Sequence, residues 1–304
     1  MNDSLALILG IACAGAGGEL FVRGIVGVAR VTRVPPGIVA VTLAAFATSS
    51  PELTVAINAA LARTSEISLG DALGSNVVNV ALILGLTAVM AAIHTPRASV
   101  RRDFPAALLV PLLLAALAYD GTLSRADGVA LLVTFVLWLT LTVIEAWRRR
   151  SAAETVLGGT RPWLAFAQCA AGLVLLVVAG RLIVFGAQGI AAAFSLDAFV
   201  VGATLVAIGT SVPELATALI ARLRGHDEVG LHTILGSNIF NGLFIIGVAA
   251  TISPIRVSWN EVAVSLLFGL VTVALVFPGR GGTIGRGRGL LLLALYTGYL
   301  LAVL

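Results

Sequence analysis

The chain has 304 residues, of which 59% are hydrophobic and only 11% are charged, and its mean hydropathy is +1.06. This composition excludes an ordinary soluble globular domain and indicates a polytopic membrane protein. The 19 basic residues, all arginine, exceed the 15 acidic ones, and the 2 cysteines both lie in apolar segments, which excludes a disulfide framework.

Ten apolar segments follow one another along the chain, each bounded by a charged or turn-rich break. A helix that crosses a bilayer needs about 20 mostly apolar residues, so we predict an all-α membrane protein with ten transmembrane helices. The predicted helices cover residues 4–29, 36–62, 69–92, 104–119, 126–147, 163–190, 197–221, 230–252, 260–277 and 288–304.

The arginines are distributed unevenly between the loops that join these helices. Fourteen fall in the loops on one side of the membrane, whereas only Arg63, Arg125 and Arg256 fall in the loops on the other side. Because cytoplasmic loops carry the excess of basic residues, the arginine-rich loops are predicted to be cytoplasmic. Both chain termini are then expected outside. We expect the lipid bilayer as the environment and no nucleic-acid partner, and the sequence leaves the oligomeric state open.

The chain contains an internal repeat. Residues 35–85 align without a gap with residues 197–247, at an offset of 162 residues, and 21 of the 51 positions are identical. Five predicted helices separate the copies, so the second copy enters the membrane in the opposite orientation. Inverted repeats build many secondary transporters, whose site lies where the repeats meet. We predict two inverted-topology five-helix repeats at 1–147 and 163–304, repeat motifs at 39–85 and 201–247, and a cytoplasmic linker at 148–162.

Each copy carries one polar motif, ATSSPEL in the first and GTSVPEL in the second. The polar residues recur at helical spacing and share one helix face, and the proline is expected to free backbone carbonyls about one turn earlier. A serine and an asparagine lie one turn apart on the following helix of each copy. The candidate metal-binding side chains are Thr48, Ser49, Glu52, Ser75 and Asn79 in the first copy, and Thr210, Ser211, Glu214, Ser237 and Asn241 in the second.

These side chains form a hard-oxygen environment, which suits Na⁺ or Ca²⁺ and differs from the thiolate and imidazole sites of zinc and copper. An ionised carboxylate at the bilayer centre costs roughly 2.5–3.5 kcal/mol on insertion scales, so Glu52 and Glu214 each need a partner or a proton. Two glutamates would neutralise one divalent cation. The alternative is a proline kink with a protonated glutamate, but its recurrence in both copies favours an ion site.

The motifs ATSSPEL with LGSNVVNVALILG, and GTSVPEL with LGSNIFNGLFIIG, resemble the two repeats of the cation/calcium antiporter superfamily, in particular the prokaryotic sodium/calcium exchangers. The resemblance covers the repeat core strongly and the ten-helix layout throughout. It implies that the side chains above bind ions together with the carbonyls of Ala45 and Ala207. It also implies that the first and sixth helices slide across the core to give alternating access, and that the membrane is a prokaryotic cytoplasmic (inner) membrane.

We therefore expect a secondary active antiporter that exchanges Ca²⁺ for Na⁺, with both ions bound as transported ions and with no other cofactor. An H⁺-coupled exchanger of Ca²⁺ or another divalent cation is an alternative, and so is a passive cation channel. Some relatives carry an aspartate in place of Asn241, so the coupling ion (Na⁺, H⁺ or K⁺) stays open, as do stoichiometry, direction and divalent-cation selectivity. We expect no enzyme, because no histidine lies near either serine motif.

Three further charged or titratable positions leave alternatives open. Asp71 lies one turn before the serine of its motif, where it either extends the polar face or is a helix-start aspartate, and we favour the second interpretation. His232 invites a proton-sensing role, but we expect a solvated residue near a cytoplasmic helix end. Glu19 pairs either with Arg181, at the equivalent position of the second copy, or with Arg23, one turn along the same helix.

Overall fold

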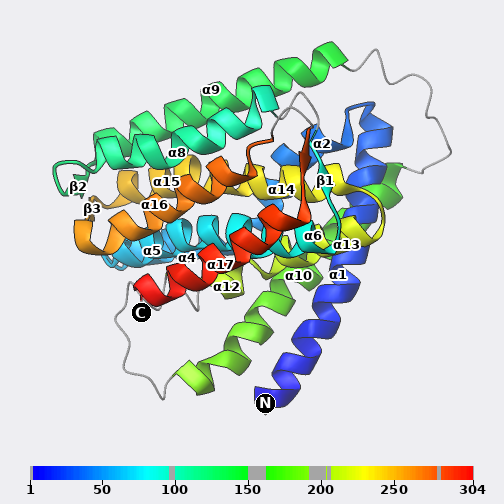
Figure 1. Cartoon of the computed structure of the whole chain (residues 1–304), viewed down its shortest axis with the longest axis horizontal. Coiled ribbons are helices and arrows are strands. Elements are labelled where there is room, and N and C mark those ends of the chain that lie inside the picture. The colour runs from blue at the N-terminus through cyan, green and yellow to red at the C-terminus, as the bar shows by residue number, and fades with distance from the viewer. Residues whose placement is uncertain are drawn as a thin grey trace.

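The computed structural model describes residues 3–95, 100–149, 162–191, 203, 207–278 and 282–303. Within these residues the chain is a bundle of helices with two short strand ladders (Figure 1). The helices are α1 (Asp3–Thr32), α2 (Pro36–Val39), α3 (Ala45–Thr48), α4 (Ser50–Leu61), α5 (Ser65–Val77), α6 (Gly85–Met90), α8 (Asp103–Leu117), α9 (Arg125–Arg149), α10 (Pro162–Ala191), α12 (Ala207–Thr210), α13 (Val212–Leu223), α14 (Asp227–Ile239), α15 (Ile246–Ile252), α16 (Trp259–Val276) and α17 (Arg286–Val303). Three π-helical turns continue these helices, namely η1 (Ala40–Ala44), η2 (Val78–Leu84) and η5 (Phe240–Ile245).

Five helices of the described part are long and apolar enough to cross a membrane. A bent pair, Pro36–Thr48 and Ser50–Leu61, meets at 44° and adds a sixth crossing if it counts as one span. Shorter apolar helices lie at Asp103–Leu117 and Val262–Val276. These helices agree with an integral membrane protein, while the count of ten crossings and the repeat boundaries stay predictions. Most of the predicted linker and the start of the predicted seventh helix lie outside the described residues.

Two continuous helical segments form the centre of the bundle. They are Ser65–Met90 and Asp227–Ile252, and 78% and 89% of their most apolar windows are buried inside the protein. Figure 1 shows α8 and α9 along one side of the bundle and the ends of α1 and α10 projecting from the other. A helix that is apolar on all sides belongs in the interior, so both GSN motifs are removed from lipid by the surrounding helices.

The two halves contact each other symmetrically at these central segments. The side-chain amide of Asn76 donates to the carbonyl oxygen of Asn238 at 3.2 Å, and the amide of Asn238 donates to the carbonyl of Asn76 at 3.0 Å. The two asparagines are 162 positions apart, which is the offset of the repeat. Reciprocal hydrogen bonds of this kind are expected between halves related by a twofold axis.

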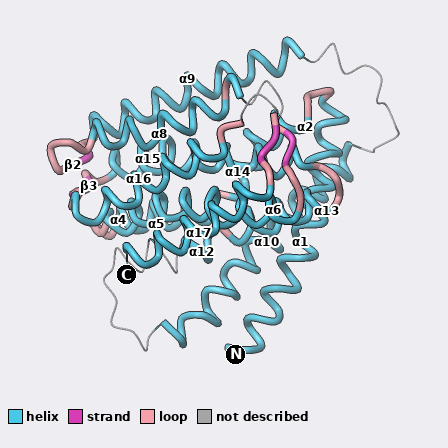
Figure 2. The backbone as a smooth tube through the Cα atoms, in the orientation of Figure 1, coloured by secondary structure: helices cyan, strands magenta, loops and turns pink. Residues whose placement is uncertain are grey.

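Two antiparallel ladders join the halves at opposite ends of the bundle (Figures 1 and 2). A further backbone hydrogen bond lies beside each ladder. The N–H of Thr95 donates to the carbonyl of Gly282 at 2.9 Å, and the N–H of Val257 donates to the carbonyl of Gly121 at 2.8 Å. Thr95 and Val257 are again 162 positions apart. The ladders pair β1 (Ile93–His94) with β4 (Thr283–Ile284), and β2 (Thr122–Leu123) with β3 (Ile255–Arg256).

Glycines allow the central helices to approach the helices that carry the polar motifs. A Cβ atom added at Gly236 would lie 2.5 Å from the carbonyl oxygen of Val41 and 2.7 Å from the Cβ of Ala45. One added at Gly74 would lie 2.5 Å from the carbonyl oxygen of Ala203. These distances are too short for any real side chain, so the glycine of each GSN motif is required for close helix packing.

We expect Gly236→Ala to destabilise the protein by about 1–3 kcal/mol, because the new methyl group overpacks the contact with a backbone carbonyl. Gly269→Ala is a matched control, since Gly269 lies in α16 and a Cβ atom added there would have no neighbour within 4 Å. Thermal unfolding of the two purified variants in detergent measures the difference. Equal melting temperatures would contradict the close contact at Gly236.

Helices α1 and α10 form a closely packed pair. A Cβ at Gly172 would lie 2.5 Å from the backbone nitrogen of Phe21, and one at Gly24 would lie 2.5 Å from the backbone nitrogen of Cys169. Buried residues of α1, α10, α13 and the helix turns before α3 form a hydrophobic cluster separate from the main core. The predicted first and sixth helices therefore contact each other along their length, and their sliding stays a prediction.

Glu19 of α1 forms the local ion pair. Its Oε1 atom lies 2.5 Å from Nε of Arg23 and 2.7 Å from Nη2 of Arg224, which follows α13. Arg181 is exposed. The alternative pairing of Glu19 with Arg181 is therefore wrong, and the sequence offered no signal for Arg224, which is 205 residues away.

Candidate functional site

The polar motif of each copy lies at a break between two helices. Helices α3 and α4 meet at Ser49, which has φ −83° and ψ 11°. Helices α12 and α13 meet at Ser211, with φ −82° and ψ 6°. Pro51 and Pro213 lie in the first turn of the next helix, where a missing N–H removes no helical hydrogen bond. Equivalent local sequences thus produce the same break twice.

The carbonyls of Ala45 and Ala207 keep their backbone partners, so the expectation of freed carbonyls is wrong at these two positions. The N–H of Ser49 donates to the carbonyl of Ala45 at 3.0 Å, and that of Ser211 donates to the carbonyl of Ala207 at 3.1 Å. Hydroxyl groups also approach these oxygens: Thr48 lies 3.4 Å from the carbonyl of Ala45, and Thr210 lies 3.3 Å from that of Ala207. The reason is that a proline lacks the N–H that would bond the carbonyl four residues earlier, at Ala47 or Gly209, whereas the donors to Ala45 and Ala207 are the N–H groups of the serines. A cation would have to use the second lone pair of these oxygens.

The hydroxyl groups of the two copies meet across the boundary between the halves. The Thr48 hydroxyl lies 3.4 Å from that of Ser237, and the Ser75 hydroxyl lies 3.3 Å from that of Thr210. All twelve predicted site residues lie in the described part of the chain and are at most 8% exposed. The structure therefore brings the hydroxyl residues of each motif against those of the other copy.

The two glutamates have different surroundings. Glu214 Oε1 accepts hydrogen bonds from Ser237 at 3.0 Å and from Ser49 at 3.3 Å. Glu52 is equally buried, with 0% exposure, but within the described residues neither of its carboxylate oxygens has a hydrogen-bond partner. A buried carboxylate without a partner is costly unless it is neutralised or binds a cation. Glu52 thus has the environment of an ion-binding side chain.

The predicted asparagines lie in π-helical turns, which often occur at functional sites. Asn79, in η2, donates to Oδ1 of Asn238 at 3.0 Å, and its own Oδ1 has no partner among the described residues. Asn241, in η5, is fully buried, and neither polar atom of its side chain has a partner there. Both amides therefore retain an oxygen for a ligand.

Asp71 belongs to the site, and the helix-start interpretation is wrong. Helix α5 begins at Ser65, so Asp71 lies in its second turn, and it is 1% exposed. The Thr210 hydroxyl donates to Asp71 Oδ1 at 3.1 Å, across the boundary between the halves. Its spacing of one turn from Ser75 was the sequence signal for this position.

The donor set suits a hard cation held by mixed oxygen ligands. Within the described residues, no three histidine, cysteine, aspartate or glutamate side chains gather closely enough to hold a metal by themselves. Hydroxyl, amide and carbonyl oxygens would therefore have to complete the coordination around Glu52 and Glu214. Ca²⁺ accepts such a shell of 6–8 mixed oxygens at about 2.3–2.6 Å.

A cavity of about 330 Å³ lies beside the site and has a different character. Apart from Thr42, its lining is apolar and largely aromatic, and it includes Phe46, Trp138 and Phe240. An apolar cavity offers a cation no ligands that replace its water. The candidate ion-binding oxygens are therefore those at the helix breaks, and this cavity adds none to them.

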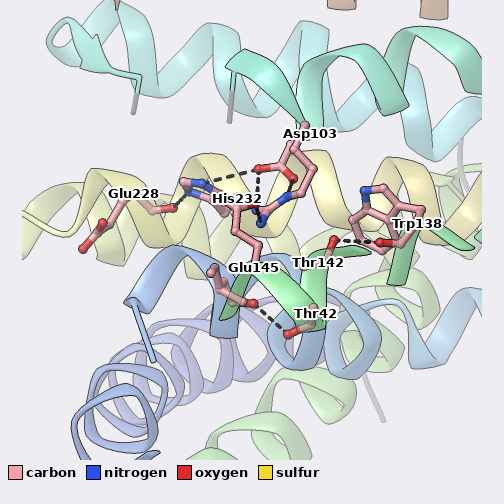
Figure 3. A network of polar contacts seen from close by, with 9 residues as sticks. Thr42, Asp103, Trp138, Thr142, Glu145, Glu228 and His232 are labelled. Carbon is pink, nitrogen blue, oxygen red and sulfur yellow. Dashed lines mark hydrogen bonds and ion pairs between the residues drawn. The ribbon is translucent and has the colours of Figure 1, made fainter. Parts of the chain in front are cut away.

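A second buried polar cluster joins α8, α9 and α14 (Figure 3). Arg102 Nε lies 2.6 Å from Asp103 Oδ1, and Arg102 Nη1 lies 2.7 Å from Glu145 Oε2. Burial alone would lower the pKa of Arg102, but the hydrogen bonds and charges of the two carboxylates raise this pKa above its ordinary value. The cluster is an ion-paired connection between three helices.

His232 belongs to this cluster, and the expectation of a solvated residue is wrong. It is 3% exposed, its Nδ1 lies 2.6 Å from the carbonyl oxygen of Glu228, and its Nε2 lies 3.5 Å from Asp103 Oδ2. A Cβ at Gly37 would lie 2.7 Å from the imidazole ring. The start of α2 and the start of α8 therefore cover a helix position that hydropathy placed near solvent.

Comparisons with known proteins agree with this arrangement. The family model described as sodium/calcium exchanger protein matches residues 4–144 and 164–304. The chain is similar to a protein of Alkalimonas amylolytica named "Putative antiporter CaxA", with 35% identity over 298 residues that cover 92% of each chain. It is also similar to the inner membrane protein YrbG of Escherichia coli (strain K12), with 35% identity over 277 residues, covering 86% of this chain and 85% of that protein. A solved structure of the sodium-calcium exchanger NCX_Mj superimposes with a TM-score of 0.83 at 29% identity, over 100% of both chains.

Proposed function

Because the chain belongs to the sodium/calcium exchanger family, we propose that it is a secondary active antiporter that exchanges Ca²⁺ for Na⁺ at the site of Glu52 and Glu214. One observation carries the proposal. The two motifs meet in the buried centre, where Ser49 of the first copy donates to Glu214 of the second at 3.3 Å and Glu52 has no hydrogen-bond partner among the described residues. Two carboxylates balance one divalent or two monovalent cations, so the two ions compete for the same charges.

The hydroxyl groups can satisfy the carboxylates of the site both when an ion is bound and when none is. A serine or threonine hydroxyl has one donor and two lone pairs, so it can donate to a carboxylate or turn a lone pair toward a cation. Ser49 and Ser237 donate to Glu214 in this structure. When a cation binds, we expect the same oxygens to become ligands. Ion binding then replaces the hydrogen bonds to Glu214, of which the one from Ser49 joins the two halves.

Alternating access is assigned to α1 and α10. They pack against each other through glycine contacts, and they contact the helices that carry the site through a second cluster of buried residues, which includes Ala44 and Ala216. Movement of this pair across the core would open the site to one side or the other. The arginine distribution supports a membrane orientation with both termini outside. The similarity to an inner membrane protein supports a prokaryotic cytoplasmic membrane.

Counterflow in proteoliposomes tests the proposed function. Vesicles containing the purified protein are loaded with Na⁺, K⁺, Mg²⁺, Ca²⁺ or an acidic buffer, and uptake of labelled Ca²⁺ is measured. We expect uptake from the Na⁺-loaded and Ca²⁺-loaded vesicles only. Uptake that follows a pH gradient without Na⁺ would identify an H⁺-coupled exchanger instead. Uptake without any exchangeable ion inside would identify a channel.

A further inference from the structure

Asp71 breaks the symmetry between the two halves of the site. Its equivalent in the second copy, 162 positions later, is Thr233, which is also buried. The Thr233 hydroxyl donates to the carbonyl of Val229 on its own helix at 2.8 Å. Asp71 instead accepts a hydrogen bond from Thr210 of the other half. One half of the site thus contains a buried carboxylate that the other half lacks.

The hydrogen bonding of the two glutamates also differs between the halves. In one half of the site, Ser237 donates to Glu214 at 3.0 Å. Its equivalent, Ser75, lies 3.3 Å from the hydroxyl of Thr210, which itself donates to the aspartate at 3.1 Å. Glu52 therefore lacks the bond that its counterpart has, and both of its oxygens are without a partner among the described residues.

The oxygens around Asp71 form a continuous series. Asp71 Oδ1 lies 3.1 Å from Thr210 Oγ1. Ser75 Oγ lies 3.3 Å from the same Thr210 oxygen and 3.4 Å from the carbonyl oxygen of Ala207. Oxygens that share one cation, each at about 2.3–2.6 Å, have similar separations from one another. Asp71 thus lies among neutral oxygens of the candidate site, in which Glu52 is buried without a hydrogen-bond partner among the described residues.

We propose that Asp71 is a further cation ligand, and that it makes the half of the site around Thr210 the one with higher affinity for Na⁺. The proposal rests on the proposed antiport function. A single carboxylate beside hydroxyl and carbonyl oxygens matches the charge of a monovalent cation, whereas Ca²⁺ requires the pair of Glu52 and Glu214. Asp71 therefore affects Na⁺ more strongly than Ca²⁺.

The test is Asp71→Asn, which keeps the size of the side chain and an acceptor for Thr210 and removes the charge. We expect the Na⁺ concentration for half-maximal Na⁺-driven Ca²⁺ flux to rise about tenfold or more, as for loss of a metal-site contact. Exchange of Ca²⁺ for Ca²⁺, which needs no Na⁺, is expected to stay within about twofold of the native rate. Equilibrium binding of labelled Na⁺ to the purified protein should weaken to the same extent as the flux.

Two further variants complete the test. Asp71→Thr introduces the residue that the second half has at the equivalent position, Thr233. A threonine is therefore suited to this helix even if the asparagine variant fails to fold. We expect the same loss of Na⁺ affinity from this variant. Thr233→Asn places the asparagine in the other half and should leave Na⁺ dependence unchanged. The proposal is overturned if folded Asp71→Asn or Asp71→Thr retains native Na⁺ dependence, or loses both exchange modes in equal proportion. Native protein without Na⁺-driven flux would instead refute the antiport function itself.

Discussion

Glu52→Gln and Glu214→Gln are each expected to reduce Na⁺-driven Ca²⁺ transport by at least about a hundredfold, which corresponds to roughly 2.7 kcal/mol of lost binding. Each change removes one of the two charges that balance a divalent cation, and the amide cannot replace it. Both side chains are fully buried, so no water compensates for the missing charge. Folding should persist, since glutamine is close in size and costs less in the membrane interior than an ionised glutamate.

Uptake of labelled Ca²⁺ into proteoliposomes measures this effect, with size-exclusion profiles and melting temperatures as the measure of folding. Glu66→Gln is the matched control. Glu66 is exposed in the first turn of α5, and it too has a glutamate at the equivalent position of the second copy. We expect native transport and stability from this control. Transport that continues in both Glu52→Gln and Glu214→Gln would remove these residues from the site.

Arg102→Ala is expected to destabilise the protein by about 3–5 kcal/mol, the range for removing one partner of a buried ion pair. Asp103 has 0% side-chain exposure and Glu145 has 26%, and both bind the guanidinium group of Arg102. Its removal leaves the Asp103 carboxylate buried beside His232 without its main partner. The connection between α8 and α9 in Figure 3 is lost at the same time.

Thermal or denaturant unfolding in detergent compares Arg102→Ala with Arg101→Ala. Arg101 precedes it in the chain and is exposed, so its loss should change stability by no more than about 0.5 kcal/mol. This pair separates the effect of the ion pairs from the loss of one positive charge at this end of the bundle. Similar losses of stability in the two variants would show that the buried cluster contributes nothing specific.

Much of the site could be predicted because it depends on features that are local or repeated in the chain. The two helix breaks follow from a serine and a proline at equivalent positions, and Ser49 and Ser211 have nearly identical backbone angles. The glycines of the GSN motifs, Gly74 and Gly236, lie at close helix contacts in both copies. Hydropathy also located most helix ends within a few residues. The role of each residue in ion binding stays a prediction.

The wrong predictions concern contacts between residues that are far apart in the chain. Asp71 was assigned to a helix start because α5 begins earlier than the hydropathy break, and its partner Thr210 is 139 residues away. His232 was assigned to solvent because its own segment is polar, although the starts of α2 and α8 cover it. The spacing of residues within one helical segment does not show which other helices pack against that segment.

The strand ladders have a mechanical consequence. β1 and β4 connect the two halves at one end of the bundle, and β2 and β3 connect them at the other. Rocking of one half against the other would stretch backbone hydrogen bonds at both ends at once, so the ladders stiffen the core against the motion that many inverted-repeat proteins use. No such ladder joins α1 or α10 to the rest within the described residues. This arrangement supports the proposal that the core stays fixed while the two helices α1 and α10 move.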